Sequence, residues 1–344
     1  MELQEMRWEG WLSTSLAAIP DLDGADETVW DALFARAEAL SGRALAAASR
    51  REDRCEFHDA LHLLLSTGDA APRTWGARHH LSARAFCLRK RLWEAYAQWQ
   101  LERLEERPLP PVPSDPRALA GYLLALHEGH PAARHPVFEY LCELGSLRDV
   151  KRFFCQESSV DARFDDRTAL ARIGLDGRAK DEYARSFAGE MGRGNPDRAH
   201  TRLFLGTARY VLEFAGTDAS LSLAPCAEAL ACGNLQRGMA LDRRHLWRLA
   251  GYLTAFELNA AWRCEKLVDA CVRQGMESER LAYLTEHIDA GAGRARGLLE
   301  EIAVPLAAAD ERAPLEIAQG FALRLQAAQD SCDSLLREFM RFGF

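Results

Sequence analysis

Apolar residues recur along this chain at intervals of three and four positions, and alternating runs of valine, isoleucine and threonine are nearly absent. The first pattern is typical of amphipathic helices, whereas the second would indicate strands. Alanine, leucine, arginine and glutamate, which form helices readily, dominate the sequence. We therefore predict an all-α fold. The expected helices lie at 27–42, 52–66, 77–106, 117–127, 136–143, 146–157, 160–173, 177–191, 197–215, 222–231, 243–257, 260–274, 277–307 and 312–341.

A proline-rich segment, PLPPVPSDP at 108–116, interrupts the helical pattern. Proline fixes φ and lacks a backbone N–H, so this segment is expected to run as stiff, extended chain. We predict an N-terminal helical segment over 1–107, a linker over 108–116 and a helical bundle over 117–344. The N-terminal segment is rich in tryptophan, and it either packs on the bundle or forms a homodimer interface.

The charge balance narrows the set of partners. The chain has 43 basic and 51 acidic residues and a net charge of −8, which opposes broad attraction to nucleic acid or anionic membranes. The nine cysteines show no zinc-type spacing, and the sequence contains neither a signal-peptide pattern nor an apolar run of about 18 residues. We expect a cytoplasmic protein that acts on a small molecule.

Glu190 and His200 flank a glycine-rich break in the helical pattern, GEMGRGNPDRAH. On one straight helix, ten residues of separation would turn the two side chains about 80° apart. Glycines at 192 and 194 can end one helix, and Pro196 can start another, so the break can bring the carboxylate and the imidazole together. A plain helix cap would explain these glycines equally well.

Two further segments carry acidic residues in apolar surroundings. Glu257 lies within GYLTAFELNAAW, and a carboxylate buried there needs a cation, a metal or a hydrogen-bonding partner. Glu157 lies in KRFFCQESSVDARFDD, with Asp161 one turn on and Asp165 two turns on, so any of the three can reach the core. The alternative is that these acids cap a following helix or interact with its dipole.

A third segment, LAYLTEHIDAGAGRARGLL, contains a potential metal-binding imidazole, His287. Gly291 and Arg294 share its helix face, at i+4 and i+7. Carboxylates and imidazoles hold non-heme iron while leaving positions open for oxygen and substrate. Glycine has no side chain to ligate a metal, and the permanently charged arginine is no ordinary ligand.

In their order along the chain and in their residue sequences, these segments resemble the heme-oxygenase-like diiron oxidases and oxygenases, often labelled iron-containing redox enzymes. The resemblance covers roughly residues 117–310 and implies a heme-oxygenase-like bundle that binds one or two non-heme irons and no heme. It also implies the use of O2 to oxidise small amines, amino acids or fatty acids, often in natural-product pathways. The metal ligands that it implies are Glu157, Glu190, His200, Glu257 and His287.

The last ligand helix of this family usually reads His-x-x-x-Asp-x-x-His, so Gly291 and Arg294 stand where two ligands are expected. Three hypotheses follow. A single or asymmetric iron site remains and still takes up O2 at an open position. Alternatively, Arg294 neutralises the acids in place of a metal, which gives a metal-free structural or regulatory relative or a cofactor-independent enzyme. In the third, Arg294 binds the carboxylate of an amino-acid substrate.

Overall fold

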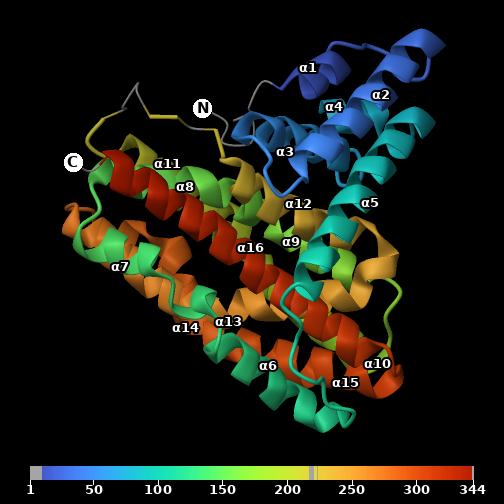
Figure 1. Ribbon diagram of the computed structural model, residues 1–344. Helices are drawn as coiled ribbons and strands as arrows, with labels where there is room; N and C mark the ends of the chain where they lie inside the picture. Colours follow the sequence, from blue (N-terminus) through green and yellow to red (C-terminus); the bar gives the residue numbers. More distant parts are fainter. Residues whose placement is uncertain (1–9, 217–220, 223, 343–344) are drawn as a thin grey trace.

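The computed structural model describes residues 10–216, 221–222 and 224–342, and over these residues the regular structure is entirely helical (Figure 1). The all-α prediction is therefore confirmed. None of the described helices is long and apolar enough to cross a lipid bilayer. The helices are α1 (Trp11–Ala17), α2 (Glu27–Ala44), α3 (Arg51–Leu65), α4 (Trp75–His79), α5 (Ala83–Glu105), α6 (Leu119–Glu128), α7 (Pro136–Glu143), α8 (Leu147–Asp161), α9 (Phe164–Ala171), α10 (Gly177–Glu190), α11 (His200–Glu213), α12 (Ala227–Leu241), α13 (Leu246–Arg273), α14 (Ala282–Gly297), α15 (Val304–Ala309) and α16 (Ala313–Phe342).

Several boundaries differ from the predicted ones. The helix expected at 77–106 is interrupted before α5, because the Ser82 hydroxyl accepts a hydrogen bond from the Ala85 N–H and caps a new helix. The two helices expected at 243–257 and 260–274 form the single helix α13. The helix expected at 222–231 lies further along as α12 and continues through Gly233. A Cβ on Gly233 would collide with the backbone carbonyl of Ser159, so this glycine permits close packing on α8 rather than ending a helix.

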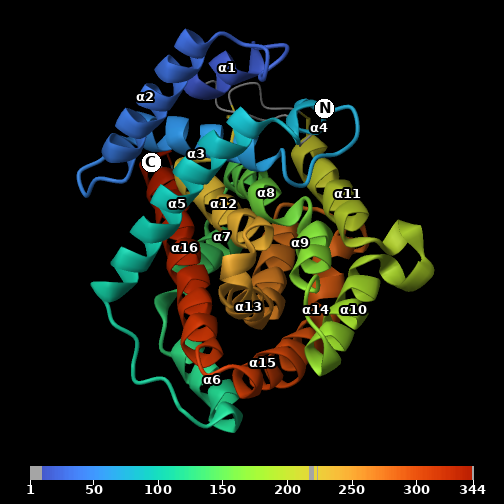
Figure 2. The ribbon, with the colours of Figure 1, turned by 90° about the vertical axis from the view of Figure 1, so that its right-hand side faces the viewer.

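Helix α13 is the central element of the bundle. Figure 2 looks nearly along it and shows α9, α14, α15 and α16 arranged around it. The closest approach is to α16, where a Cβ on Gly251 would collide with the carbonyl of Ile317 and a Cβ on Gly320 would collide with that of Arg248. Glycine on both helices lets the two backbones approach closely, and this places the side chains of α13 at the centre of the molecule.

The N-terminal helices α1–α5 lie together against one end of the bundle (Figures 1 and 2). Helices α3 and α12 pack against each other, and α5 packs on α16. The contact is apolar with a few buried hydrogen bonds: the Tyr96 hydroxyl donates to the Ala231 carbonyl at 2.9 Å, and the Asn234 amide donates to the His58 carbonyl at 2.8 Å. Residues 108–113 are non-helical, as the prolines predicted.

A buried ion pair joins the loop after α3 to the bundle. The Asp69 carboxylate accepts hydrogen bonds from Arg237 of α12, and Arg167 of α9 lies 3.9 Å away. All three side chains are at most 6% exposed. Burial by itself would raise the pKa of Asp69, but the charge of Arg237 lowers it below its ordinary value. The carboxylate therefore stays ionised and compensates two buried guanidinium groups.

Asp69→Asn is expected to lower the free energy of unfolding by about 3–5 kcal/mol, because it leaves two buried arginines without a carboxylate. Urea denaturation followed by circular dichroism measures this loss. Glu300→Gln is the control, since it breaks the exposed pair with Arg296 and should change stability by no more than about 0.5 kcal/mol. Equal losses in the two variants would contradict the role given to Asp69.

Candidate functional site

The glycine-rich break brings Glu190 and His200 together. Helix α10 ends at Glu190 and α11 begins at His200, and His200 Nδ1 lies 2.8 Å from Glu190 Oε2. Gly192 has φ +72°, and a Cβ there would lie 2.8 Å from the backbone carbon of Arg198. Glycine is therefore required for the loop to fold back on itself. Both side chains are buried, so the loop places a carboxylate and an imidazole in the core.

His287 approaches this pair from α14. The centroids of the His200 and His287 rings lie 5.3 Å apart. His287 Nδ1 lies 2.9 Å from the Tyr283 carbonyl oxygen and donates to it, whereas the buried Nε2 has no hydrogen-bond partner among the described residues. Burial, together with the charges of His200 and Arg294, lowers the pKa of His287 to about 4. A neutral imidazole with one nitrogen fixed by a carbonyl and the other available is typical of a metal ligand.

Arg294 contacts the same carboxylate from the other side. Its Nη1 lies 3.0 Å from Glu190 Oε1, so Glu190 bridges His200 and Arg294. Burial by itself would raise the pKa of Glu190, but the charges of His200 and Arg294 hold it well below its usual range. Burial would lower the pKa of Arg294, but the charges of Glu257 and Glu190 raise it. Arg294 therefore acts as a fixed cation between two acids.

Aromatic rings surround the histidines. Phe164 stacks on His200 with ring centroids 5.5 Å apart, and Phe256 stacks on Phe164 at 4.8 Å. The Tyr283 ring lies 4.5 Å from that of His287. These rings exclude water and so strengthen the electrostatic interactions inside the cluster. Tyr283 could have been found from its position four residues before His287, whereas nothing in the sequence points to Phe164.

Glu157 lies in a different cluster. Its Oε2 is 2.9 Å from Nη1 of Arg263 on α13, and the buried Arg324 of α16 lies beside this pair. The guanidinium groups of Arg263 and Arg324 lie 5.3 and 4.9 Å from the centroid of the Phe256 ring. Phe256 in turn stacks on Phe164, so two aromatic rings lie between the two charged clusters. Sequence reasoning missed both arginines, which are distant in the chain from Glu157.

The two aspartates considered as alternatives to Glu157 are placed differently. The expectation that Glu157, Asp161 and Asp165 share one helix was wrong, because the backbone breaks at Arg163 (φ −143°, ψ 40°) between α8 and α9. Asp165 lies in the first turn of α9, where its charge favours the helix dipole, and it accepts a hydrogen bond from Thr201 at 2.8 Å. The side chain of Asp161 lies outside the described residues.

Gly291 has a packing role at its position on α14. A Cβ there would lie 3.3 Å from the Cβ of Ala261, so the absence of a side chain lets α14 lie close to α13. The same absence removes a donor from the face that carries His287. A side chain at this position would require Ala261 or the helix to shift by a few tenths of an ångström.

Glu190, His200 and His287 are the potential metal donors that the structure brings closest together. In the described part of the chain, no three histidine, cysteine, aspartate or glutamate side chains are already arranged to hold an ion, and Glu190 contacts both His200 and Arg294. The chemistry of Glu190, His200 and His287 suits a single ion, and the unpartnered Nε2 of His287 is the nitrogen that would bind it. Glu157 lies outside this group because it is paired with Arg263, whereas the buried Glu257 of α13 interacts with Arg294.

Fold and site together define an all-helical protein with a buried cluster of carboxylate and imidazole groups. A family model described as an iron-containing redox enzyme matches residues 151–329, which is more than half of the chain. The chain therefore belongs to this family of redox enzymes, and the resemblance inferred from the sequence is confirmed. The match contains every residue of the cluster and leaves α1–α5 outside it. Comparison with curated proteins finds no match.

Glu157→Gln is expected to lower the free energy of unfolding by about 3 kcal/mol, because it removes the negative charge from beside two buried arginines. It should leave the iron content of the reconstituted protein unchanged, as measured by elemental analysis. Asp330→Asn, which breaks the partly exposed pair with Arg103, is the matched control and should cost no more than about 1 kcal/mol. Loss of iron without loss of stability would instead make Glu157 a ligand.

Proposed function

We propose that this protein is an O2-using oxidase or oxygenase that depends on a single non-heme iron held by Glu190, His200 and His287. Two imidazoles and one carboxylate are the donor set of many mononuclear iron(II) oxygenases. The observation that carries the proposal is His287, whose Nδ1 is fixed by a backbone carbonyl and whose buried Nε2 has no hydrogen-bond partner among the described residues. Other buried histidines, such as His58, also have a ring nitrogen without a partner, but the His287 ring lies 5.3 Å from that of His200, which contacts Glu190.

Iron bound by these residues would supply a redox centre with open positions for O2. Arg294 holds Oε1 of Glu190 and keeps the carboxylate ionised, which leaves Oε2 on the side of His200. The Tyr283 carbonyl orients the His287 ring, and the rings of Phe164 and Tyr283 limit the access of water. The chain's own residues thus orient the donors and keep the site dry.

The substrate class that the family implies is a small amine, amino acid or fatty-acid-like molecule, in specialised metabolism. The hypothesis that Arg294 binds a substrate carboxylate stays a prediction. Because Glu190 already occupies Nη1 of this guanidinium, a substrate carboxylate would have to share Arg294 with Glu190.

A second candidate function is favoured by the contact between Arg294 and Glu190. In this candidate, the guanidinium compensates Glu190 and Glu257 in place of iron, and the protein is a structural or regulatory relative or a cofactor-independent enzyme of the same fold. The two candidates differ in whether ferrous iron displaces the Glu190–His200 contact. They therefore make opposite predictions for metal content.

Anaerobic reconstitution with ferrous iron should give about one equivalent of bound iron, as expected for a single two-histidine, one-carboxylate site. His287→Ala should weaken iron binding by at least about tenfold, because it removes a ligand and not merely its support. His58→Gln is the matched control, since His58 is also buried with a nitrogen lacking a hydrogen bond but lies on α3. Stopped-flow absorbance after oxygen is added then reports on reactivity. A wild-type protein that stays iron-free under ferrous excess would overturn the first candidate and support the second.

Restoring donors at 291 and 294 should raise the bound iron from about one to about two equivalents, because the changes supply a carboxylate and an imidazole on the face of His287. The variant is Gly291→Asp with Arg294→His, combined with Ala261→Gly to make room for the new Cβ. Arg296→His on the exposed side of α14 is the control. If the iron content does not rise in a folded triple variant, the proposed correspondence of positions 291 and 294 with ligand positions is wrong.

A further inference from the structure

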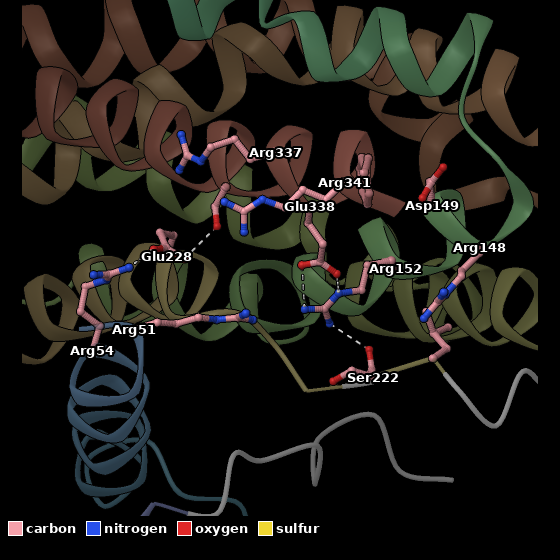
Figure 3. Close-up of a pocket in the computed structure, with 13 residues that line it drawn as sticks. Arg51, Arg54, Arg148, Asp149, Arg152, Ser222, Glu228, Arg337, Glu338 and Arg341 are labelled. Carbon is pink, nitrogen blue, oxygen red and sulfur yellow. Dashed lines mark hydrogen bonds and ion pairs between the residues drawn. The ribbon is translucent and has the colours of Figure 1, made fainter. Parts of the chain in front are cut away.

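A second polar site lies where the N-terminal segment meets the bundle. A cavity of about 530 Å³ opens there between α3, α8, α12 and α16. It shares no lining residue with the Glu190 cluster, which consists of Glu190, His200, His287 and Arg294. Figure 3 shows arginine side chains entering it from α3, α8 and α16, around Glu228 and Glu338. The six arginines of the lining are Arg51, Arg54, Arg148, Arg152, Arg337 and Arg341.

The acidic residues of this cavity already have partners. Glu338 accepts a hydrogen bond from Arg152 at 2.8 Å, and Glu228 accepts one from Arg54 at 3.2 Å. Asp149 forms the capping box at the start of α8. The lining therefore has six arginines against three acids, a surplus of three positive charges in a chain whose net charge is −8. A local inversion of charge of this size points to an anionic ligand.

Three of the arginines face the cavity without an acidic partner. Within the described part of the chain, Arg51, Arg337 and Arg341 form no ion pair, and all three are exposed. The side chain of Arg152, in contrast, is held in place, since it is buried and also donates hydrogen bonds to the carbonyl oxygens of Ser222 and Ala224. The site thus combines a fixed guanidinium with available guanidinium groups from two different helices.

We propose that this cavity binds a small molecule through a diphosphate or triphosphate group. The forked guanidinium group of arginine matches the geometry of phosphate oxygens. One phosphate ester carries about 1.5 to 2 negative charges at pH 7, so two linked phosphates balance a surplus of three, whereas a monocarboxylate does not. The volume of the cavity lies within the range of small-ligand sites.

The site depends on the N-terminal segment, because Arg51 and Arg54 belong to α3. That helix lies outside the range matched by the family. The phosphate site is thus built by the added segment together with the bundle, and it is independent of whether iron binds at the Glu190 cluster. A ligand here would hold α3, α8 and α16 together.

Isothermal titration calorimetry with inorganic pyrophosphate, at constant ionic strength, tests the proposal directly. Pyrophosphate should bind at least about tenfold more tightly than sulfate or citrate, and Arg51→Gln or Arg337→Gln should each weaken it about tenfold, as expected for loss of one charged hydrogen-bonding group. Arg296→Gln is the control, since this exposed arginine lies on α14 away from the cavity. His287→Ala should bind pyrophosphate as wild type does, which excludes binding through iron.

Several results would overturn the proposal. These are binding no tighter than that of sulfate, equally tight binding of citrate, or an equal loss in Arg296→Gln. Tight binding of a polyglutamate peptide without binding of pyrophosphate would assign the surface to an acidic protein partner instead. Melting temperatures of the variants should match the wild type, because the substituted side chains are exposed. Pyrophosphate should also raise the melting temperature of the wild type but not that of a combined Arg51→Gln, Arg337→Gln variant.

Discussion

A carboxylate taken into a helical core must be matched by positive charge, and this requirement organises the interior of the protein. Moving one such ion out of water costs several kcal/mol even after relaxation, and only close, well-aligned partners offset that cost. Glu190 is held by His200 and Arg294, Glu157 by Arg263, and Asp69 by Arg237. Apart from the contact between Glu190 and His200, which crosses a single loop, each pair joins elements that are distant in the chain. The same contacts that keep these acids ionised therefore also fix the relative positions of the helices.

The central position of α13 follows from a second constraint, the close approach of helix backbones. Glycines at 251 and 320 let α13 and α16 approach, and Gly291 does the same between α13 and α14. Glu257, Arg263 and Phe256 all project from α13, so both charged clusters depend on this packing. A side chain at Gly251 or Gly320 would collide with backbone of the other helix and so displace the groups that neutralise the acids. The positions of the charged groups on α13 therefore depend on how closely α13 packs against its neighbours.

The parts of the site that follow from local rules could be predicted from the sequence. Helical periodicity predicted the all-α fold, and the glycines and proline at 192–196 predicted the turn that joins Glu190 to His200. Partners set by tertiary packing could not be predicted. Glu157 meets Arg263 from another helix, and the role of Gly291 is visible only against Ala261. The arginine-lined cavity arises from four helices, and no single segment of the sequence carries its pattern.

Arg294 places a permanent positive charge beside the carboxylates of Glu190 and Glu257, and this charge bears directly on the proposed iron site. A metal cation bound in this cluster would be repelled by the guanidinium, because like charges interact strongly in a water-poor core. The carboxylates of Glu190 and Glu257 would offset part of that repulsion, since both already interact with Arg294. The charge of Arg294 therefore favours one bound cation over two in the proposed site, whose donors are Glu190, His200 and His287.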